Sequence, residues 1–461
     1  MSATGATREI LVELSQFVAG LGYEDLPERV REQAKLTFQH NLVVALAARQ
    51  ERLPGQDWDH WPAGLSPTQS ATRLTDGRRA PTERAVVTNS LAMGARAQHD
   101  EHPGAISHFG STVLPPLLAV AEQGRVDGAG ILTAMVVGYE VGARIGSASV
   151  RATARQGFRP TGLYGPFAGA AAAGKAMGLD VDALVSALAF AANGSAGVTQ
   201  TWLRGTDEWR YQTAFAARNG FVAADLAGQG VRGAADTLEG ANGFFRAFGA
   251  PDVDAPAVLH RLGTDWALEH ILLKPYPVCA FNQAPVQQVL RVKAEHRIDP
   301  ADVTGVRVQM NPEDLTYPGV DVTGGVETRT AAIMCLRTCL ALAILHDDVP
   351  IDRLEEPGAQ AVRALADRID LVADPSVATH CSSLSIDRNG GTTVDSGPAA
   401  GTVYDREVSE ALIGRLQPLT GLDDSQMAEL VEVLSTLETR PGLDDVLALV
   451  RRSAPTASPD P

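Results

Sequence analysis

The sequence is poor in basic residues and contains no basic run: 39 lysines and arginines stand against 55 aspartates and glutamates, a formal net charge of −16 at pH 7. Such a chain offers no electrostatic footprint for nucleic acid or for an anionic membrane surface, so we expect neither as a partner. No apolar stretch is long enough to span a bilayer, and residues 1–9 lack the apolar core of a signal peptide. We therefore expect a cytoplasmic protein.

Cysteine is also scarce. The four cysteines form no C-x-x-C pair, and Cys335 and Cys339 are four residues apart in an apolar segment. Buried thiols explain this pattern better than a disulfide or a metal site. No H-E-x-x-H motif or facial-triad spacing is present, so the one possible metal-binding set is His99, Asp100 and His102. We expect no metal.

The first half of the chain has a helical pattern. At 461 residues the chain exceeds the usual size of one hydrophobic core, so we expect two domains. Apolar residues recur with a 3.6-residue period from Thr7 to about Ala250, for example in 27–48, 83–97 and 129–146. The small residues of 167–178 and 182–197 allow close packing and predict interior helices, and Gly178 is a plausible C-terminal stop for the first of them.

The pattern changes after Leu272. Residues 303–310 alternate like a strand, and Asn389-Gly390-Gly391 within 382–394 is a hairpin signal, with helices expected over 327–346 and 357–368. The sequence thus predicts a mainly α protein with a smaller α+β domain. The expected parts are a helical domain at 1–264, the α+β domain at 265–400, a helical segment at 401–452 that returns to the first domain, and a disordered tail at 453–461.

The segment 98–110 is the densest group of titratable residues, with His99, Asp100, Glu101, His102 and His108. Histidine exchanges protons near neutral pH, and a neighbouring carboxylate can serve as a base or fix the imidazole tautomer. Spacing alone favours a reactive site no more than a polar turn between two helices.

The order of motifs resembles the MmgE/PrpD family, whose known members include 2-methylcitrate dehydratases, cis-aconitate decarboxylases and an epimerase. The resemblance covers most of the chain and implies an all-helical domain formed from both chain ends, an α+β lid domain, a homodimer and no obligatory metal or cofactor. It is carried by residues 98–110 with Val113-Leu114-Pro115-Pro116, Gly138-Tyr139-Glu140 with Arg144, Gly157-Phe158-Arg159-Pro160-Thr161, Gly165 to Gly178, Ala216-Ala217-Arg218-Asn219-Gly220, Leu238-Glu239-Gly240 with Gly243-Phe244-Phe245, and Lys274-Pro275-Tyr276-Pro277-Val278-Cys279.

The expected site departs from the family's pattern. The family's Asp-aromatic-Asp-Asp run reads Gln98-His99-Asp100-Glu101, so Asp100 matches, and the histidine before the apolar run is retained as His108. Two family histidines are replaced, by Arg159 and Gln283, and the tyrosine of Phe-Ser-x-x-Tyr is absent at Thr338. Arginine binds carboxylates well but cannot act as a general base, which indicates a changed substrate or a changed step.

These matches give the candidate residues their expected roles. We expect proton transfer by His108 with Asp100, His102 as a possible replacement partner, and Lys274 facing an anion at the domain boundary. Expected substrate-binding residues are Arg159, Tyr164, Arg210, Cys279 and Gln283. Packing explains Tyr164 equally well, a pairing with Asp207 or Glu208 explains Arg210, and Cys279 can be a packed side chain. Glu140 and Arg144 are more simply a structural pair.

Three functions fit these residues. The first is a cofactor-independent lyase of the dehydratase type acting on a small, anionic carboxylate or a related activated carbonyl compound, with specialised biosynthesis as one setting. The second is an isomerase or epimerase that uses the same proton abstraction. The third is a ligand-binding protein that kept the fold and lost the chemistry.

Overall fold

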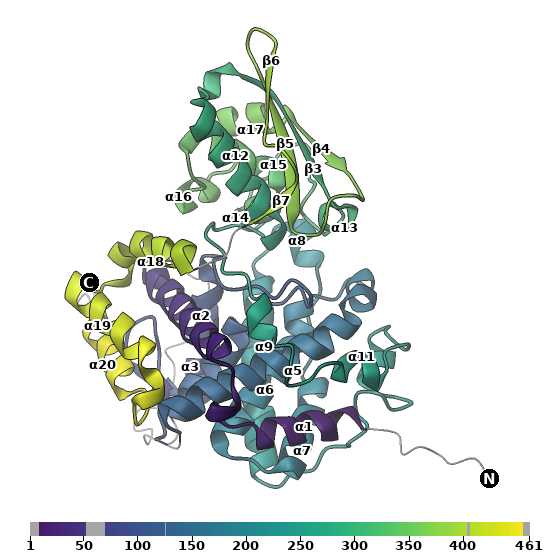
Figure 1. Cartoon of the computed structure of the whole chain (residues 1–461), viewed down its shortest axis with the longest axis vertical. Helices are drawn as coiled ribbons and strands as arrows, with labels where there is room; N and C mark the ends of the chain where they lie inside the picture. The colour runs from purple at the N-terminus through teal and green to yellow at the C-terminus, as the bar shows by residue number, and fades with distance from the viewer. Residues whose placement is uncertain (1–8, 52–69, 125, 403–405, 455–461) are drawn as a thin grey trace.

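The computed structural model describes residues 9–51, 70–124, 126–402 and 406–454, and it consists of a large helical body with a smaller lid over one end (Figure 1). The expected mainly α fold with an α+β part is confirmed. The helical body contains α1 Ile10–Gly20, α2 Glu28–Ala47, β1 Ser70–Thr72, β2 Arg79–Pro81, α3 Thr82–Ala95, α4 Gly110–Ala121, α5 Gly128–Arg155, α6 Pro160–Met177, α7 Val181–Asn193, α8 Gln200–Arg204, α9 Glu208–Gly228, α10 Phe244–Ala247, α11 Ala255–Leu259, α18 Arg406–Thr420, α19 Asp424–Ser435 and α20 Asp444–Arg452. The lid, residues 274–402, contains α12 Gln283–His296, β3 Val303–Met310, α13 Pro312–Leu315, α14 Arg329–Met334, α15 Leu336–His346, α16 Ile351–Glu355, α17 Gln360–Ala366, β4 Ile369–Ala373, β5 Cys381–Arg388, β6 Thr392–Asp395 and β7 Ala400–Gly401.

Helix α6 lies at the centre of the helical body and packs against α4, α5, α7 and α9. All of its residues are buried except Lys175 and Met177. Small residues allow this close packing, because a Cβ added to Gly220 of α9 would lie 2.9 Å from the Cα of Gly169. The helix ends at Gly178, whose φ of +71° is the left-handed conformation that glycine favours. The expected interior helix and its glycine stop are confirmed.

Replacing Gly162 of α6 by alanine is expected to lower the free energy of unfolding by at least about 1–3 kcal/mol, the usual cost of overpacking an interior. The new Cβ would lie 2.0 Å from the backbone oxygen of Ala196. The matched variant is Gly414→Ala, in the exposed middle of α18, where a Cβ meets no atom within 4 Å. That change should stabilise by about 0.5–1 kcal/mol, because alanine restricts the unfolded chain. Denaturant unfolding measures both, and equal stabilities of the two variants would contradict the packing described for α6.

The lid is built on a mixed sheet with strand order β4-β3-β5-β6, and β7 pairs with β5. In β3 the side chains of Val306, Val308 and Met310 are buried, while those of Arg307 and Gln309 are exposed. The turn at residues 389–391 joins the antiparallel strands β5 and β6. The expected strand at 303–310 and the hairpin are confirmed. The parallel partner β4 was not expected, because its pairing with β3 joins residues far apart in the sequence.

One expected helix of the lid is broken. The helix predicted over 327–346 is divided into α14 and α15 at Cys335, whose ψ of 108° is extended. The next amide, that of Leu336, donates to the carbonyl oxygen of Val320 instead of continuing the helix. Cys335 and Cys339 are buried free thiols, as expected.

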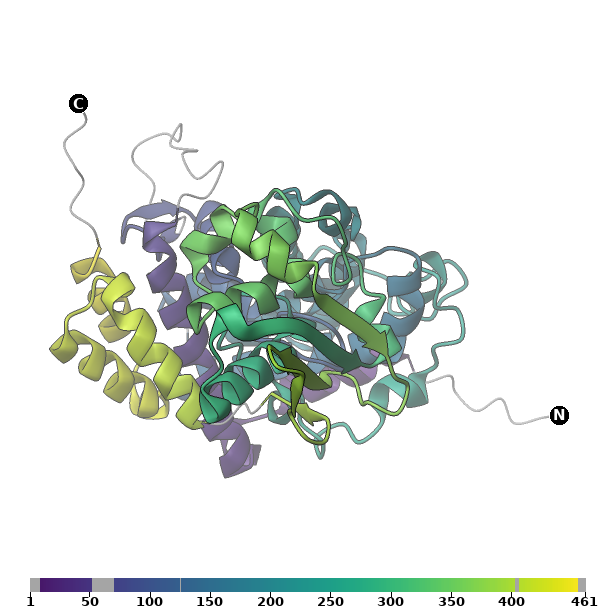
Figure 2. The ribbon, with the colours of Figure 1, turned by 90° about the horizontal axis from the view of Figure 1, so that it is seen from above.

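The C-terminal helices α18, α19 and α20 return to the helical body, where α18 and α19 pack beside α2 (Figures 1 and 2). Arg49, just after α2, donates to the backbone oxygens of Thr420, Val450 and Ser453. Ser453, the first residue of the expected tail, is therefore buried, and residues 455–461 lie outside the described residues. Within the described ranges, none of the helices combines the length and hydropathy needed to cross a bilayer.

Two hydrophobic cores meet near the junction of body and lid. One core joins residues 10–273 to residues 412–450. The other joins residues 278–386 to three side chains of the helical body, those of Ala97, Trp202 and Trp209. Since the lid completes its own core with residues of the helical body, the two parts share a continuous interior at this junction.

Candidate active site

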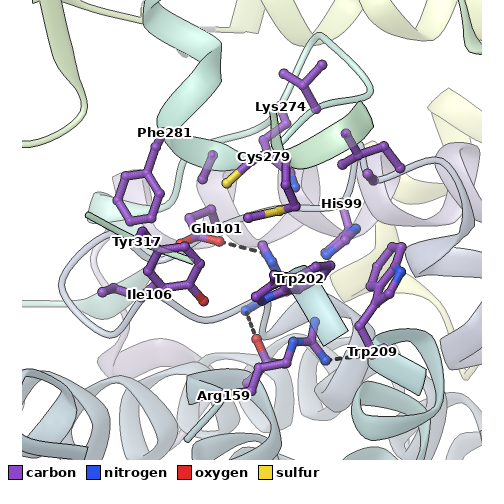
Figure 3. Close-up of a pocket in the computed structure, with 17 residues that line it drawn as sticks. His99, Glu101, Ile106, Arg159, Trp202, Trp209, Lys274, Cys279, Phe281 and Tyr317 are labelled. Carbon is purple, nitrogen blue, oxygen red and sulfur yellow. Dashed lines mark hydrogen bonds and ion pairs between the residues drawn. The ribbon is translucent and has the colours of Figure 1, made fainter. Parts of the chain in front are cut away.

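A cavity lies between the helical body and the lid (Figure 3). Four of the nine predicted site residues line it: His108, Arg159, Lys274 and Cys279. Its full lining is Ala97, His99, Glu101, Ile106, His108, Arg159, Thr161, Trp202, Trp209, Lys274, Val278, Cys279, Ala280, Phe281, Tyr317, Ile333 and Met334.

The short extended segment around Glu101 decides which side chains reach the cavity. Glu101 and Leu272 exchange both of their backbone hydrogen bonds, each 2.8 Å long. Alternate side chains of an extended segment point to opposite sides. His99 and Glu101 accordingly line the cavity, whereas Asp100 and His102 do not.

His108 and Glu101 form a buried pair at the cavity. The Nδ1 atom of His108 lies 2.7 Å from Oε2 of Glu101 and 2.8 Å from the backbone oxygen of Asp100. Because both neighbours are acceptors, Nδ1 carries the proton in neutral His108, and Nε2 keeps its lone pair. Burial lowers the pKa of His108, and Lys274 lowers it further, whereas Glu101 acts in the opposite direction. His108 is thus held in the tautomer of a general base.

Glu101 remains ionised in spite of its burial. Burial alone would raise the pKa of its carboxyl group, but the neighbouring His108 and Lys274 bring that pKa below its ordinary value. Its side chain is 1% exposed, and Oε1 has no hydrogen-bond partner among the described residues. Glu101 therefore places one uncompensated acceptor oxygen at the cavity.

A second imidazole, that of His99, lies edge-on to His108 with the ring centroids 4.0 Å apart. Both ring nitrogens of His99 are buried and have no hydrogen-bond partner among the described residues. Burial lowers the pKa of His99 well below its usual value, and His108 and Lys274 add to this effect. His99 is therefore a neutral ring with a free donor and a free acceptor.

Lys274 brings a cation to the cavity from the lid. Its side chain is 2% exposed, and no carboxylate of the described residues lies within ion-pair distance of its ammonium group. Burial lowers the pKa of Lys274, and Glu101 raises it in part. A buried ammonium group without a direct counter-ion is a strong binding point for an anion.

Arg159 is the second cation and precedes the first turn of α6. Its Nη1 donates to the backbone oxygen of Trp209 and to Oγ1 of Thr213, each at 2.6 Å, while Nη2 has no hydrogen-bond partner among the described residues. The guanidinium carbon lies 5.4 Å from the ring centroid of Trp202. Burial lowers its pKa to about 10, so Arg159 stays charged at neutral pH. Half of this group is held by the protein, and Nη2 is free for a ligand.

Two weakly acidic groups add to the polar lining. Burial raises the pKa of the Cys279 thiol to about 12, and it raises that of the Tyr317 phenol as well. Both groups are therefore protonated at neutral pH. They can donate hydrogen bonds but are poor sources of a thiolate or a phenolate.

Three other predicted residues lie away from the cavity lining. Asp100 is fully buried and accepts the N–H of Gly110 at 3.0 Å. His102 accepts the N–H of Ala105 through Nδ1 at 3.1 Å. Tyr164 is a core residue whose hydroxyl lies 2.7 Å from Oγ1 of Thr153. These contacts hold the loop and the helices that surround the cavity.

Arg210 and Gln283 also contact the protein rather than the cavity. Arg210 donates to the backbone oxygen of Ala95 at 2.9 Å, and its Nε lies 3.6 Å from Oδ1 of Asp207. This is one of the two ion pairs that the sequence predicts as an alternative to substrate binding. Gln283 donates to the backbone oxygens of Tyr276 and Val278 and accepts the N–H of Tyr276. It therefore shapes the turn that carries Lys274 and Cys279.

The pair of Glu140 and Arg144 is structural, as expected. Nε of Arg144 lies 2.6 Å from Oε1 of Glu140. Oε2 of Glu140 accepts the N–H of Ala267 at 2.8 Å, and Arg144 donates to the backbone oxygens of His260 and Asp265. The pair holds the segment that leads to the lid.

Replacing Asp100 by asparagine should change how stability depends on pH. Burial raises the pKa of Asp100 to about 7 from an ordinary value of 3.8. Between about pH 4 and pH 7 the unfolded chain therefore loses a proton that the folded protein keeps, so this group's contribution to stability falls as the pH rises. We expect the stability of the wild type relative to Asp100→Asn to fall across this window. Denaturant unfolding at several pH values measures it, and a constant difference would contradict the assignment.

The cavity is bordered by backbone in costly conformations. Ala97 and Ile106 both have left-handed φ values, 54° and 49° respectively, and both line the cavity. Each such conformation costs roughly 1–3 kcal/mol for a residue other than glycine, and these conformations gather at functional sites.

The alternative metal-binding set of His99, Asp100 and His102 does not converge here, because His99 faces the cavity and the other two do not.

The lining of the cavity includes residues outside the nine predicted site residues. His99 and Glu101 depart from the family's pattern, yet both line the cavity, and alternation along an extended segment puts them on the same side. Trp202, Trp209, Phe281 and Tyr317 carry no local signal, because four separate segments bring them together. Tyr317 supplies a phenol to the cavity, which Thr338 does not line.

Comparisons with known proteins identify the family of this chain. Residues 12–255 match the model of the MmgE/PrpD N-terminal domain, and residues 276–411 match that of the MmgE/PrpD C-terminal domain. A cis-aconitate decarboxylase of Aspergillus terreus is 27% identical over 334 residues, which cover 68% of each chain. A cis-aconitate decarboxylase-like protein of Aspergillus oryzae, oryM, is 24% identical over 98% of this chain and 99% of its own. Because the N-terminal match alone spans more than half of the sequence, the chain belongs to the MmgE/PrpD family.

Proposed function

We propose that the protein is a cofactor-independent lyase of the dehydratase type, which acts on a small carboxylate or a related activated carbonyl compound that is not the usual substrate of the family. The observation that carries this proposal is the oriented base His108 in one cavity with the two cations Lys274 and Arg159. Elimination next to a carboxylate needs such a base, together with positive charge for the carboxylate and the developing enolate. The relatives named as decarboxylases of cis-aconitate also support an enzyme that acts on carboxylates.

Each of these groups has a defined role in the proposed reaction. Nε2 of His108 takes the carbon-bound proton, and the electron pair of that C–H bond passes into the enolate. Lys274 and Nη2 of Arg159 stabilise the negative charge of this intermediate. The enolate then collapses to the alkene as the C–O bond breaks, and protonated His108 returns its proton to the departing hydroxide, so that water leaves. Glu101 stabilises the imidazolium formed between these two steps.

A single incubation separates this reaction from its alternatives. The protein is mixed in heavy water with hydroxycarboxylates that range from citrate to 3-hydroxy-3-phenylpropanoate, and proton NMR follows alkene formation and the loss of the carbon-bound hydrogen. Alkene formation by the wild type, and none by His108→Asn, is expected. Absence of both signals across the panel would contradict the proposal and favour a ligand-binding protein.

An isomerase or epimerase is the second candidate. Cys279 and Tyr317 are both weak acids here, because burial raises the pKa of each. The cavity therefore offers little help to a departing hydroxide beyond the proton of His108, which suits a reaction that returns the proton to carbon. Deuterium incorporation into a substrate without alkene formation would favour this reading over the lyase.

A further inference from the structure

We infer that the substrate is a monoanion, with one carboxylate on a planar, apolar body, and that Trp202 selects that body. This inference rests on the proposed function, because it names the substrate class of the same cavity. It depends on two properties of the lining, its charge and its aromatic walls, which are independent of the identity of the base.

The charge of the lining limits the charge of the ligand. Among the described lining residues the cations are Lys274 and Arg159, and the carboxylate is that of Glu101. Half of the Arg159 guanidinium is already bound to Trp209 and Thr213. Since the imidazoles of His99 and His108 are neutral at neutral pH, the cavity carries one more positive than negative charge. One bound carboxylate is balanced by this excess.

A tricarboxylate would bring two further negative charges without counter-ions in the described lining. Burying a charge that lacks a counter-ion is strongly unfavourable, because the charge loses its hydration without an opposite charge to replace it. Glu101 makes this cost higher, because its free Oε1 repels any additional carboxylate in the cavity. The second cation has a different use during the reaction, since an enolate oxygen becomes negative as the proton leaves.

The walls of the cavity are aromatic on both sides of the domain junction. From the helical body, the rings of Trp202 and Trp209 lie with centroids 5.3 Å apart. From the lid, the rings of Phe281 and Tyr317 lie with centroids 5.0 Å apart (Figure 3). Ile333 and Met334 of α14 add further apolar surface. Covering an apolar, planar group with these ring faces is favourable, whereas the ring faces themselves offer no counter-ion to a second carboxylate.

Among these aromatic residues, Trp202 is the one expected to select the apolar body of the substrate. It lies in the short helix α8, is 7% exposed, and has the Arg159 guanidinium over its ring. A ligand whose carboxylate reaches Nη2 of Arg159 therefore has its body near the indole ring. The next residue, Leu203, is 59% exposed and does not line the cavity, so it provides a matched control on the same helix.

Calorimetry with two probes tests the inference on the full chain. Cinnamate is a planar monocarboxylate, and citrate is a tricarboxylate without an apolar ring. We expect cinnamate to bind at least tenfold more tightly than citrate, Trp202→Ala to weaken cinnamate binding at least tenfold, and Leu203→Ala to leave it unchanged. Trp202→Phe, which keeps an aromatic ring, should retain most of the affinity and guards against a folding defect in Trp202→Ala. Tighter binding of citrate, binding of neither probe, or equal affinities of the Trp202→Ala and Leu203→Ala variants would overturn the inference.

The same probes distinguish this inference from the proposed function. Elimination from citrate without binding of cinnamate would overturn the monoanion and retain the lyase. Binding of cinnamate, with no elimination or hydrogen exchange for any hydroxycarboxylate of the panel, would retain the monoanion and overturn the lyase.

Discussion

Replacing His108 by asparagine is expected to lower kcat by about 10²–10⁴, the usual contribution of a positioned general base. Asparagine keeps a polar group of similar reach near Glu101 and the backbone oxygen of Asp100 but cannot take a proton. Substrate binding should change little, because the cations that hold the anion remain. Initial rates and calorimetry measure the two effects separately. The matched control is His296→Asn, on the exposed end of α12, which should leave both unchanged.

The pH profile gives this prediction a second measurement. His108 acts as a base only when it is neutral, and its pKa lies below the ordinary value. Activity should therefore be lost as the pH falls through a value below 6.5. Glu101 raises the pKa of His108, so Glu101→Gln should move this acidic limb to still lower pH. If Glu101→Gln merely disturbed packing, it would lower the rate at every pH without moving the acidic limb. Full activity of His108→Asn would show that His108 is not the base.

Replacing Lys274 by methionine is expected to lower kcat/KM by about 10²–10³, comparable to removing one donor from an oxyanion site. The ammonium group lies in the cavity without a direct ion pair, so its charge is available to the substrate. Because the variant removes a buried charge that folding must desolvate, its stability should equal or exceed that of the wild type. An activity loss without a stability loss would thus assign the charge to ligand binding.

Two further variants make the result for Lys274 specific. Lys175→Met, a partly buried lysine of α6 that donates to the backbone oxygen of Ala19, is the matched control and should retain full kcat/KM. Lys274→Arg keeps the charge but spreads it over a planar group, so it should recover part of the binding and little of kcat. Wild-type kcat/KM in the Lys274→Met variant would show that the anionic group of the substrate does not bind at Lys274.

Much of the fold could be predicted from the sequence because it follows from local periodicity. The small residues of α6, the alternation in β3 and the turn at residues 389–391 each determine their own element. Strand β4 could not be predicted in this way, since its place depends on a parallel pairing with β3 across more than fifty residues. The break at Cys335 depends likewise on a distant carbonyl oxygen, that of Val320.

The site could be predicted only in part, for a related reason. His108, Arg159, Lys274 and Cys279 lie in motifs with a recognisable order, and the structure brings them to one cavity. The sequence within the 98–102 segment does not show which side chains face inward, because that depends on the pairing with Leu272. The aromatic walls depend entirely on how the lid meets the helical body.

The return of the C-terminal helices to α2 has a consequence for synthesis on the ribosome. Helices α18 and α19 cover one surface of α2, and Arg49 binds the backbone oxygens of Thr420, Val450 and Ser453, so both sets of contacts form only after the whole lid has been translated. At about 5–20 residues per second, the interval between the end of the first body segment at residue 273 and the start of α18 is on the order of ten seconds. During that interval the nascent chain exposes an apolar helix face while the complete lid emerges. The face of α2 that α18 and α19 later cover is therefore a surface that chaperones for exposed apolar segments can bind in the nascent chain.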